Sequence, residues 1–241
     1  MNRILIFEDK LQDFIQIKDP ETLTHLHRHL LIQKGQTLKC TLVGQGLFEA
    51  QVTRVQKELV EITPTGSLKE AVSAPFHLHI GLSRPPSLKK ILEHATTLGV
   101  SHFHFFKSSL SEKSYLQSKV LQNKEIQKRL KLGLAQSACY AHLPQVKISK
   151  EFPRDFFKDL KGQIFRPDPF KCQSFSDFQL NSPPVHLILG PERGFTKQEV
   201  SFFESLKIKS VRLCPGILRV EIATFAALGQ AQYVYESSEK K

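Results

Sequence analysis

Two different patterns of hydrophobic residues divide the chain. Over residues 38–63, short runs alternate apolar and polar residues around the turn Gly44-Gln45-Gly46, a pattern typical of a small β-barrel or sandwich. From residue 76 onward, strand-like runs alternate with helical runs, as in a mostly parallel sheet covered by helices. We therefore predict an α/β protein with a small all-β domain over residues 1–73 and an α/β domain over residues 74–241.

The second region predicts most of its elements in order. Apolar residues at every second position from Phe76 to Leu82 predict a strand, and the helical spacing from Leu88 to Leu98 predicts a helix that stops at Gly99. The later expected elements are a strand over 100–106, a long helix over about 116–140, a strand near 146–148, a strand ending at 190, a helix from 197, a strand over 210–213 and a last helix over about 218–235. The segment between residues 149 and 184 has no clear pattern.

The positive charge is confined to the second region. Residues 1–74 carry nine lysines and arginines against nine acidic residues, whereas residues 75–241 carry 25 against 14 and hold the whole net charge of +11. A basic surface favours a polyanionic partner, because neutralising phosphates releases their counterions. Composition alone is equally consistent with a basic surface that only keeps the protein in solution.

Several classes of protein lose support from the sequence. No run approaches the roughly 18 apolar residues of a membrane span, and the charged start MNRILIFEDK is unlike a signal peptide, so we expect a cytoplasmic protein. The four cysteines lie far apart, which predicts reduced thiols rather than a zinc or disulfide site. His25, His27 and His29 have no accompanying acidic or cysteine cluster, and we predict no metal.

The stretch LILGPERGF, residues 187–195, has the character of a ligand-binding corner. An apolar strand ends in Gly-Pro, and in parallel α/β sheets ligands bind beyond the carboxyl ends of strands. Thr196 and Glu199 form a capping box that fixes the start of the next helix. The stretch matches neither the phosphate-binding loop nor the dinucleotide fingerprint. An ordinary turn between a strand and a helix is the open alternative.

A second corner follows the next strand. Cys214-Pro215-Gly216-Ile217 leads into the helix LRVEIATFAALGQAQYVY, which places Arg219 and Glu221 at the helix start. The apolar stripe of this helix is predicted to be core, and its alanines and glycine keep it slim enough for close packing, for example against a second subunit. The stripe consists of Leu218, Ile222 and Phe225. The two corners could flank one ligand.

Together these stretches resemble a known family. LGPERGF followed by a strand and LCPGILRVEIA is similar to the paired signature of the SPOUT methyltransferases that methylate N3 of a uridine in small-subunit ribosomal RNA. LKKILEHATTLGV, SSLSEKS and AQSACYAHLP resemble further segments of that family in the same order, and the N-terminal region resembles its PUA-like domain. The resemblance covers nearly the whole chain.

The resemblance implies a fold, a cofactor and a set of site residues. It implies a PUA-like β-barrel followed by a SPOUT domain with a C-terminal trefoil knot, a homodimer, S-adenosylmethionine as cofactor and ribosomal RNA or the small ribosomal subunit as partner. The residues expected to bind the cofactor are Leu189, Gly190, Pro191, Glu192, Gly194, Leu213, Cys214, Gly216, Ile217 and Leu218. The expected catalytic residues are Arg219 and Glu221, because the weakly acidic uracil N3 must lose its proton and the resulting charge must be stabilised. Arg219 would stabilise that charge or bind RNA phosphate, and Glu221 would orient Arg219 or relay the proton.

A basic segment predicts where RNA binds. Residues 107–131 carry a local net charge of +5, with a solvated helix face as the alternative reading. The expected RNA-binding residues are Lys107, Lys113, Lys124, Lys128 and Arg129. Two further functions stay open. The chain departs from the family pattern, with Arg193 in place of a glycine and one arginine lost before Ile217, so it could be a catalytically silent RNA-binding paralogue. A nucleotide-binding hydrolase using the same corner has less support.

Overall fold

The computed structural model describes residues 3–171 and 173–239 and divides the chain into two compact units. The first unit comprises the residues up to 73 together with 134–143, and the second comprises 74–133 and the residues from 144 onward. A break between residues 73 and 74 lies where the sequence pattern changes. The assignment of 134–143 to the first unit has no counterpart in that pattern.

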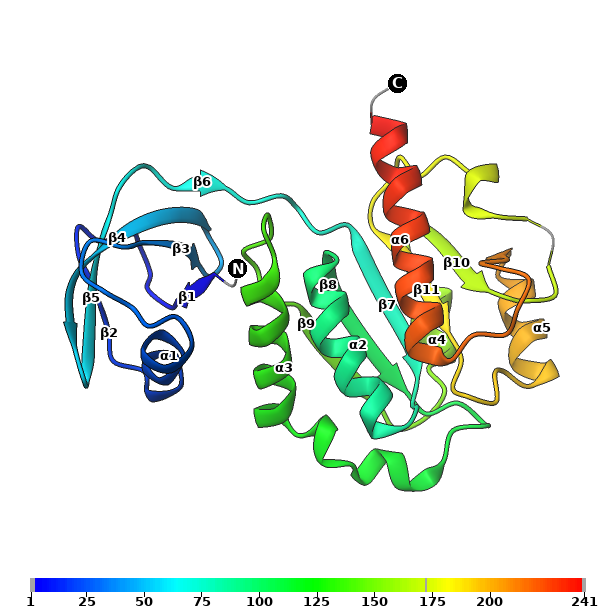
Figure 1. Cartoon of the computed structure of the whole chain (residues 1–241). Coiled ribbons are helices and arrows are strands. Elements are labelled where there is room, and N and C mark those ends of the chain that lie inside the picture. Colours follow the sequence, from blue (N-terminus) through cyan, green and yellow to red (C-terminus); the bar gives the residue numbers. More distant parts are fainter. Residues whose placement is uncertain (1–2, 172, 240–241) are drawn as a thin grey trace. The chain divides into compact units, whose positions relative to one another are not determined.

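The first unit is a six-stranded sheet with one short helical segment (Figure 1). Its strands are β1 (Ile4–Ile6), β2 (Ile15–Ile17), β3 (Thr37–Leu42), β4 (Gly46–Gln56), β5 (Leu59–Pro64) and β6 (Lys69–Glu70), and its helical segment is α1 (Pro20–Thr24) with the π-helical turn η1 (His25–His29). The order is β1-β3-β4-β5-β2 with β6 beside β4, and only β1 and β3 pair in parallel. Alternation in β4 buries Phe48, Ala50 and Val52 in the core.

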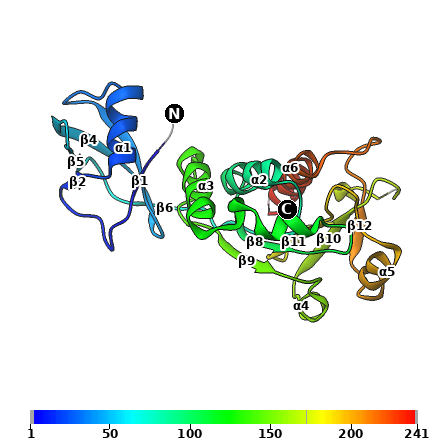
Figure 2. The same ribbon diagram turned by 90° about the horizontal axis from the view of Figure 1, so that it is seen from below.

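The second unit is a parallel sheet with helices on both faces (Figure 2). Its strands are β7 (Phe76–Gly81), β8 (Val100–Phe106), β9 (Gln145–Ser149), β10 (Gln163–Pro167), β11 (Val185–Leu189) and β12 (Lys209–Val211), in the order β12-β10-β11-β7-β8-β9. Helices α2 (Pro85–Thr97) and α6 (Val220–Glu239) cover one face, and α4 (Arg154–Lys158) and α5 (Lys197–Ser205) cover the other. A short 3-10 turn, η4 (Phe175–Asp177), lies between β10 and β11.

Local sequence signals explain where the helices begin and end. Helix α2 has prolines at its first two positions, where no backbone N–H is needed, and ends before Gly99, whose φ of 82° suits glycine. The predicted capping box of α5 is present, with the Thr196 hydroxyl accepting from the Glu199 N–H and the Glu199 carboxylate accepting from the Thr196 N–H.

The prediction of one long helix over residues 116–140 is wrong. The structure has two 3-10 turns, η2 (Lys113–Gln117) and η3 (Lys119–Leu121), and then α3 (Asn123–Gln136). Serines interrupt the helix because their hydroxyls bind nearby backbone N–H groups. Ser118 is extended and accepts from the Val120 N–H at 3.3 Å, and Ser137 accepts from the Tyr140 N–H at 2.9 Å.

The prediction that Leu218, Ile222 and Phe225 form a core stripe is also wrong. Ile222 is 48% exposed, and the other two are only partly buried. The face of α6 that packs inward carries Val220, Thr224, Ala227, Leu228 and Ala231 instead. Small residues on that face bring the helix close to its neighbours and turn the larger apolar side chains outward. Across the described residues, no helix is long and apolar enough to cross a membrane.

Candidate active site

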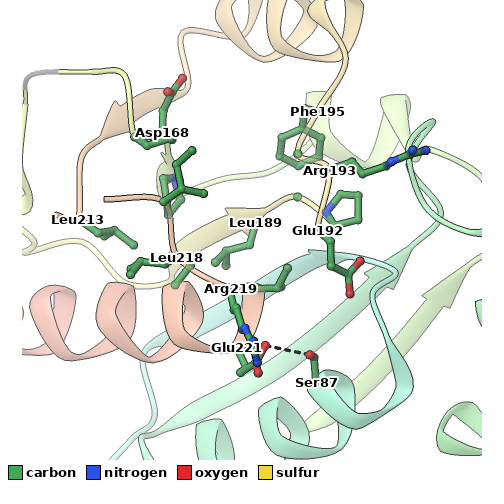
Figure 3. Close-up of a pocket in the computed structure, with 18 of the residues that line it drawn as sticks. Ser87, Asp168, Leu189, Glu192, Arg193, Phe195, Leu213, Leu218, Arg219 and Glu221 are labelled. Carbon is green, nitrogen blue, oxygen red and sulfur yellow. Dashed lines mark hydrogen bonds between the residues drawn. The ribbon is translucent and has the colours of Figure 1, made fainter. Parts of the chain in front are cut away.

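A cavity of about 900 Å³ lies at the carboxyl edge of the parallel sheet (Figure 3). Its walls are the segments that follow β10, β11 and β12, together with the starts of α2 and α6. The ten residues that the sequence predicts to bind a cofactor all line it, as do Arg219 and Glu221. Two corners that are separate in the sequence therefore meet in one cavity.

The segment after β11 is held in a tight turn. The Gly194 N–H donates to the Pro191 carbonyl at 2.8 Å, and Gly194 has a φ of 72°, which favours glycine. A Cβ atom on Gly81 would lie 2.6 Å from Pro191 Cδ, so the end of β7 must lack a side chain there. The Glu192 carboxylate accepts from the Arg84 N–H at 2.7 Å and ties this segment to the start of α2. The turn is thus fixed from both sides.

Glu221 is a buried carboxylate among donors. It is 6% exposed, accepts from the Ser87 hydroxyl at 2.8 Å and lies 3.8 Å from the Lys90 ammonium. Burial alone would raise the pKa of Glu221, but a backbone N–H, Ser87, Lys90 and Arg219 together hold that pKa below its ordinary value. In Figure 3, Arg219 and Glu221 lie side by side near Ser87. Glu221 is therefore ionised at neutral pH.

The end of β10 and the segment after it contribute an ion pair that the sequence did not reveal. Arg166 is buried and donates to Asp168 at 3.0 Å and to the Ser210 hydroxyl at 2.9 Å, while Asp168 also accepts from the Phe170 N–H. Both charged residues line the cavity. The run Pro167-Asp168-Pro169, which follows Ile164-Phe165-Arg166, could have indicated this corner. It lies in the segment that shows no clear hydrophobic pattern.

The sequence also missed the start of α2. Arg84, Ser87 and Lys90 line the cavity beside the segment after β11. The run SRPPS ends a strand at the same sheet edge as the two corners, and this position could have identified it.

The predicted RNA-binding residues lie outside the cavity wall. Lys113, Lys124 and Lys128 are exposed, and Lys107 is partly buried. Arg129 differs from them because it pairs with Glu93 at 3.0 Å and with Glu125 at 2.8 Å. Its charge is already balanced within the protein.

Five histidines, the histidine cluster, lie on neighbouring strands of the same sheet. They are His77, His79, His102, His104 and His186, and the strand register sets His77 beside both His102 and His186. The His186 Nε2–H donates to the Lys161 carbonyl at 2.9 Å, which leaves its Nδ1 to accept from the His79 Nε2–H at 2.9 Å. His79, His104 and His186 are buried, so their side chains pack inside the domain rather than contact a ligand from solvent.

The histidine cluster is electrically neutral. Burial, followed by the neighbouring histidines, lowers the pKa of His79 well below its ordinary value. Burial and then Lys147 lower the pKa of His104 to about 4. Within the described ranges, no group of three or more histidine, cysteine or acidic side chains is arranged to hold a metal ion.

The fold defines an α/β domain with its cavity at the carboxyl edge of a parallel sheet. The family model described as an RNA methyltransferase domain matches residues 70–232, and the chain belongs to that family.

The similar proteins carry a more specific name. The chain is 25% identical over 235 residues to ribosomal RNA small subunit methyltransferase E 1 of Borreliella burgdorferi, covering 94% of this chain and 95% of the relative. It is 26% identical over 212 residues to ribosomal RNA small subunit methyltransferase E of Treponema pallidum, covering 84% and 79%. The crystal structure of ribosomal RNA small subunit methyltransferase E from Neisseria gonorrhoeae bound to S-adenosyl methionine has the same fold, with a TM-score of 0.79, 18% identity and 98% coverage of each chain.

Proposed function

We propose that this protein is an S-adenosylmethionine-dependent methyltransferase that acts on N3 of a uridine in small-subunit ribosomal RNA. The observation that carries the proposal is the single cavity that gathers both predicted corners in a chain of the RNA methyltransferase family. Relatives named for small-subunit ribosomal RNA methylation match nearly its whole length.

The cavity wall suits S-adenosylmethionine. Leu189, Leu213 and Leu218 provide an apolar slot for a flat adenine (Figure 3). Glycines at 190, 194 and 216 also line the cavity and leave the backbone accessible. The ten residues expected from the sequence would hold the cofactor there. When bound, this cofactor supplies a methyl group on a positively charged sulfur that is already electrophilic.

The protein then has to align the uracil and stabilise its charge. The N3 proton passes to solvent water at the open cavity, and Arg219, exposed at the start of α6, is placed to balance the negative charge left on the uracil. The lowered pKa makes Glu221 a weak proton acceptor. We therefore assign Glu221 to orienting Arg219, and Glu192 to holding the turn after β11.

The finer features of the resemblance are part of the proposal. Strand β10 lies between β11 and β12 in the sheet, and the segments that follow these three strands line one cavity. This arrangement supports a C-terminal trefoil knot. The first unit, with its mixed sheet, supports a PUA-like RNA-binding domain. Exposed Ile222 and Tyr233 on α6 support a homodimer through that helix. A cytoplasmic location follows from a ribosomal RNA substrate.

The test is methyl transfer to ribosomal RNA. Purified protein, labelled S-adenosylmethionine and small-subunit RNA from cells lacking N3-methyluridine should yield that nucleoside in the digested RNA. RNA binding without transfer would favour the silent paralogue. Turnover of a nucleoside triphosphate without transfer would favour the hydrolase.

A further inference from the structure

The cavity has two chemically different sides. Leu189, Leu213 and Leu218 lie together on one side in Figure 3, and Glu192 and Arg193 lie on the other. Arg84 and Lys90, at the start of α2, also line the cavity. An apolar side suits the adenosine of the donor, whereas a cationic side suits a polyanion.

Arg84 and Arg193 are brought to the same part of the rim. The hydrogen bond from the Arg84 N–H to Glu192 fixes one arginine directly against the residue that precedes the other. Both arginine side chains belong to exposed residues. The two exposed residues therefore flank a hydrogen-bonded turn at the edge of the cavity, and in Figure 3 the Arg193 side chain extends outward from that edge.

Within the described residues, the cavity wall carries three other cations, of which Lys90 and Arg166 are paired with carboxylates, while Arg219 is the residue assigned above to the uracil. Lys90 is paired with Glu221 and Arg166 with Asp168. Among the residues that the structure describes, neither Arg84 nor Arg193 has an ion pair. Glu192 precedes Arg193 in the sequence and contacts Arg84. Its carboxylate accepts from the backbone N–H of Arg84 and forms no ion pair with either guanidinium group among the described residues. Their positive charge is available for a ligand.

We propose that Arg84 and Arg193 bind phosphate groups of the substrate RNA next to the target nucleotide. This inference rests on the proposed function and specifies how the RNA enters the cavity. Guanidinium groups bind phosphate oxygens through paired hydrogen bonds. The RNA backbone then crosses the rim at the start of α2 and the turn after β11, and the target base turns inward toward Arg219.

The proposal predicts a separation of RNA binding from donor binding. Arg84→Glu and Arg193→Glu should each lower affinity for an unmodified small-subunit RNA fragment about tenfold, and should reduce the slope of log affinity against log salt by about one. Affinity for S-adenosylhomocysteine, measured by calorimetry, should not change. Arg212→Glu is the matched control, because Arg212 is an exposed arginine outside the cavity wall.

Three outcomes would overturn the assignment. Unchanged RNA affinity and salt slope in both variants is the first, and an equal loss in Arg212→Glu is the second. The third is a loss of S-adenosylhomocysteine affinity, which would assign the arginines to the carboxylate of the donor. Arg84→Gln and Arg193→Gln, with circular dichroism, exclude misfolding as the cause of a loss.

The same experiment distinguishes failure of the proposed function. Suppose that the wild-type protein transfers no methyl group and that Arg193→Glu still binds the RNA more weakly than the wild type does. This pair of results would contradict the proposed methyl transfer and support the phosphate site. Methyl transfer by both variants with wild-type RNA affinity would contradict the phosphate site alone.

Discussion

The cavity and the histidine cluster both place polar side chains on one parallel sheet, yet their chemistry is opposite. At the carboxyl edge, the start of α6 brings the exposed Arg219 and the buried but ionised Glu221 to the cavity. On the covered strands, His79 and His104 are buried, and their lowered pKa values keep them neutral. Burial therefore does not by itself decide the charge of a polar residue: Glu221 stays ionised because donors and cations surround it, whereas burial makes His79 and His104 neutral.

The largest expected effect is on stability and comes from the covered face. Phe157 is 1% exposed and packs its ring against His79, His104 and Phe203. Phe157→Ala should lower the free energy of unfolding by about 3–5 kcal/mol, because it leaves a cavity in the core. Denaturant unfolding measures this change. Wild-type stability in the variant would show that the packing of this face contributes little.

The next effect is on catalysis and comes from the open edge. Arg219→Ala should lower the rate of methyl transfer about 100-fold, as does removal of a group that stabilises developing charge. Arg219 is exposed, so the free energy of unfolding should stay near the wild-type value. Single-turnover transfer to ribosomal RNA is the measurement, with Arg212→Ala as control. Full activity in Arg219→Ala would remove its catalytic role.

The pH dependence of stability sharpens the comparison. The pKa of His104 is about 4 in the folded protein and near 6.5 in the unfolded chain, so acid protonates the unfolded state first. The contribution of neutral His104 to the free energy of unfolding is fully present above pH 6.5 and is lost as the pH drops toward 4. At pH 5.5, protonation of His104 in the unfolded chain should lower the free energy of unfolding by about 1 kcal/mol.

The matched variants test that assignment. His104→Gln should reduce the pH dependence of the unfolding free energy without abolishing it, because the other four histidines of the cluster also have lowered pKa values. His142→Gln should leave it unchanged, because His142 is exposed. Equal pH dependence in the wild type and His104→Gln would show that His104 does not contribute to it.

The smallest effect concerns the hydrogen bond from Ser87 to Glu221. Ser87→Ala removes a donor from the carboxylate and so raises the Glu221 pKa. The rate should fall about fivefold, or about 1 kcal/mol, because Glu221 acts on the uracil only through Arg219 and loses one hydrogen bond. Loss of activity on acidification should also begin at a higher pH. Ser87→Thr should restore the wild-type pH profile, and an unchanged profile in Ser87→Ala would argue against this positioning role.

The sequence predicted the parts of the site that are local. The corners at Gly190 and Gly216 each lie within one short run of glycine and proline after a strand, and such runs can be recognised directly. The bond between Ser87 and Glu221 joins residues 134 positions apart, and no local pattern encodes it. The helix prediction over residues 116–140 failed for a similar reason. The spacing of apolar residues does not show that the hydroxyls of Ser118 and Ser137 bind backbone N–H groups that a continuous helix would use.

The strand order has a consequence for shortened forms of this protein. Strand β7 pairs with β11, so Phe76 meets Val185 only after more than a hundred residues of intervening chain. A fragment that ends before Val185 would leave one edge of β7 unpaired, with Phe76, Leu78 and Ile80 beside it. Exposed edges of that kind recruit other chains. Fragments cut between β9 and β11 should therefore aggregate, and a useful truncation of the second unit has to retain β11.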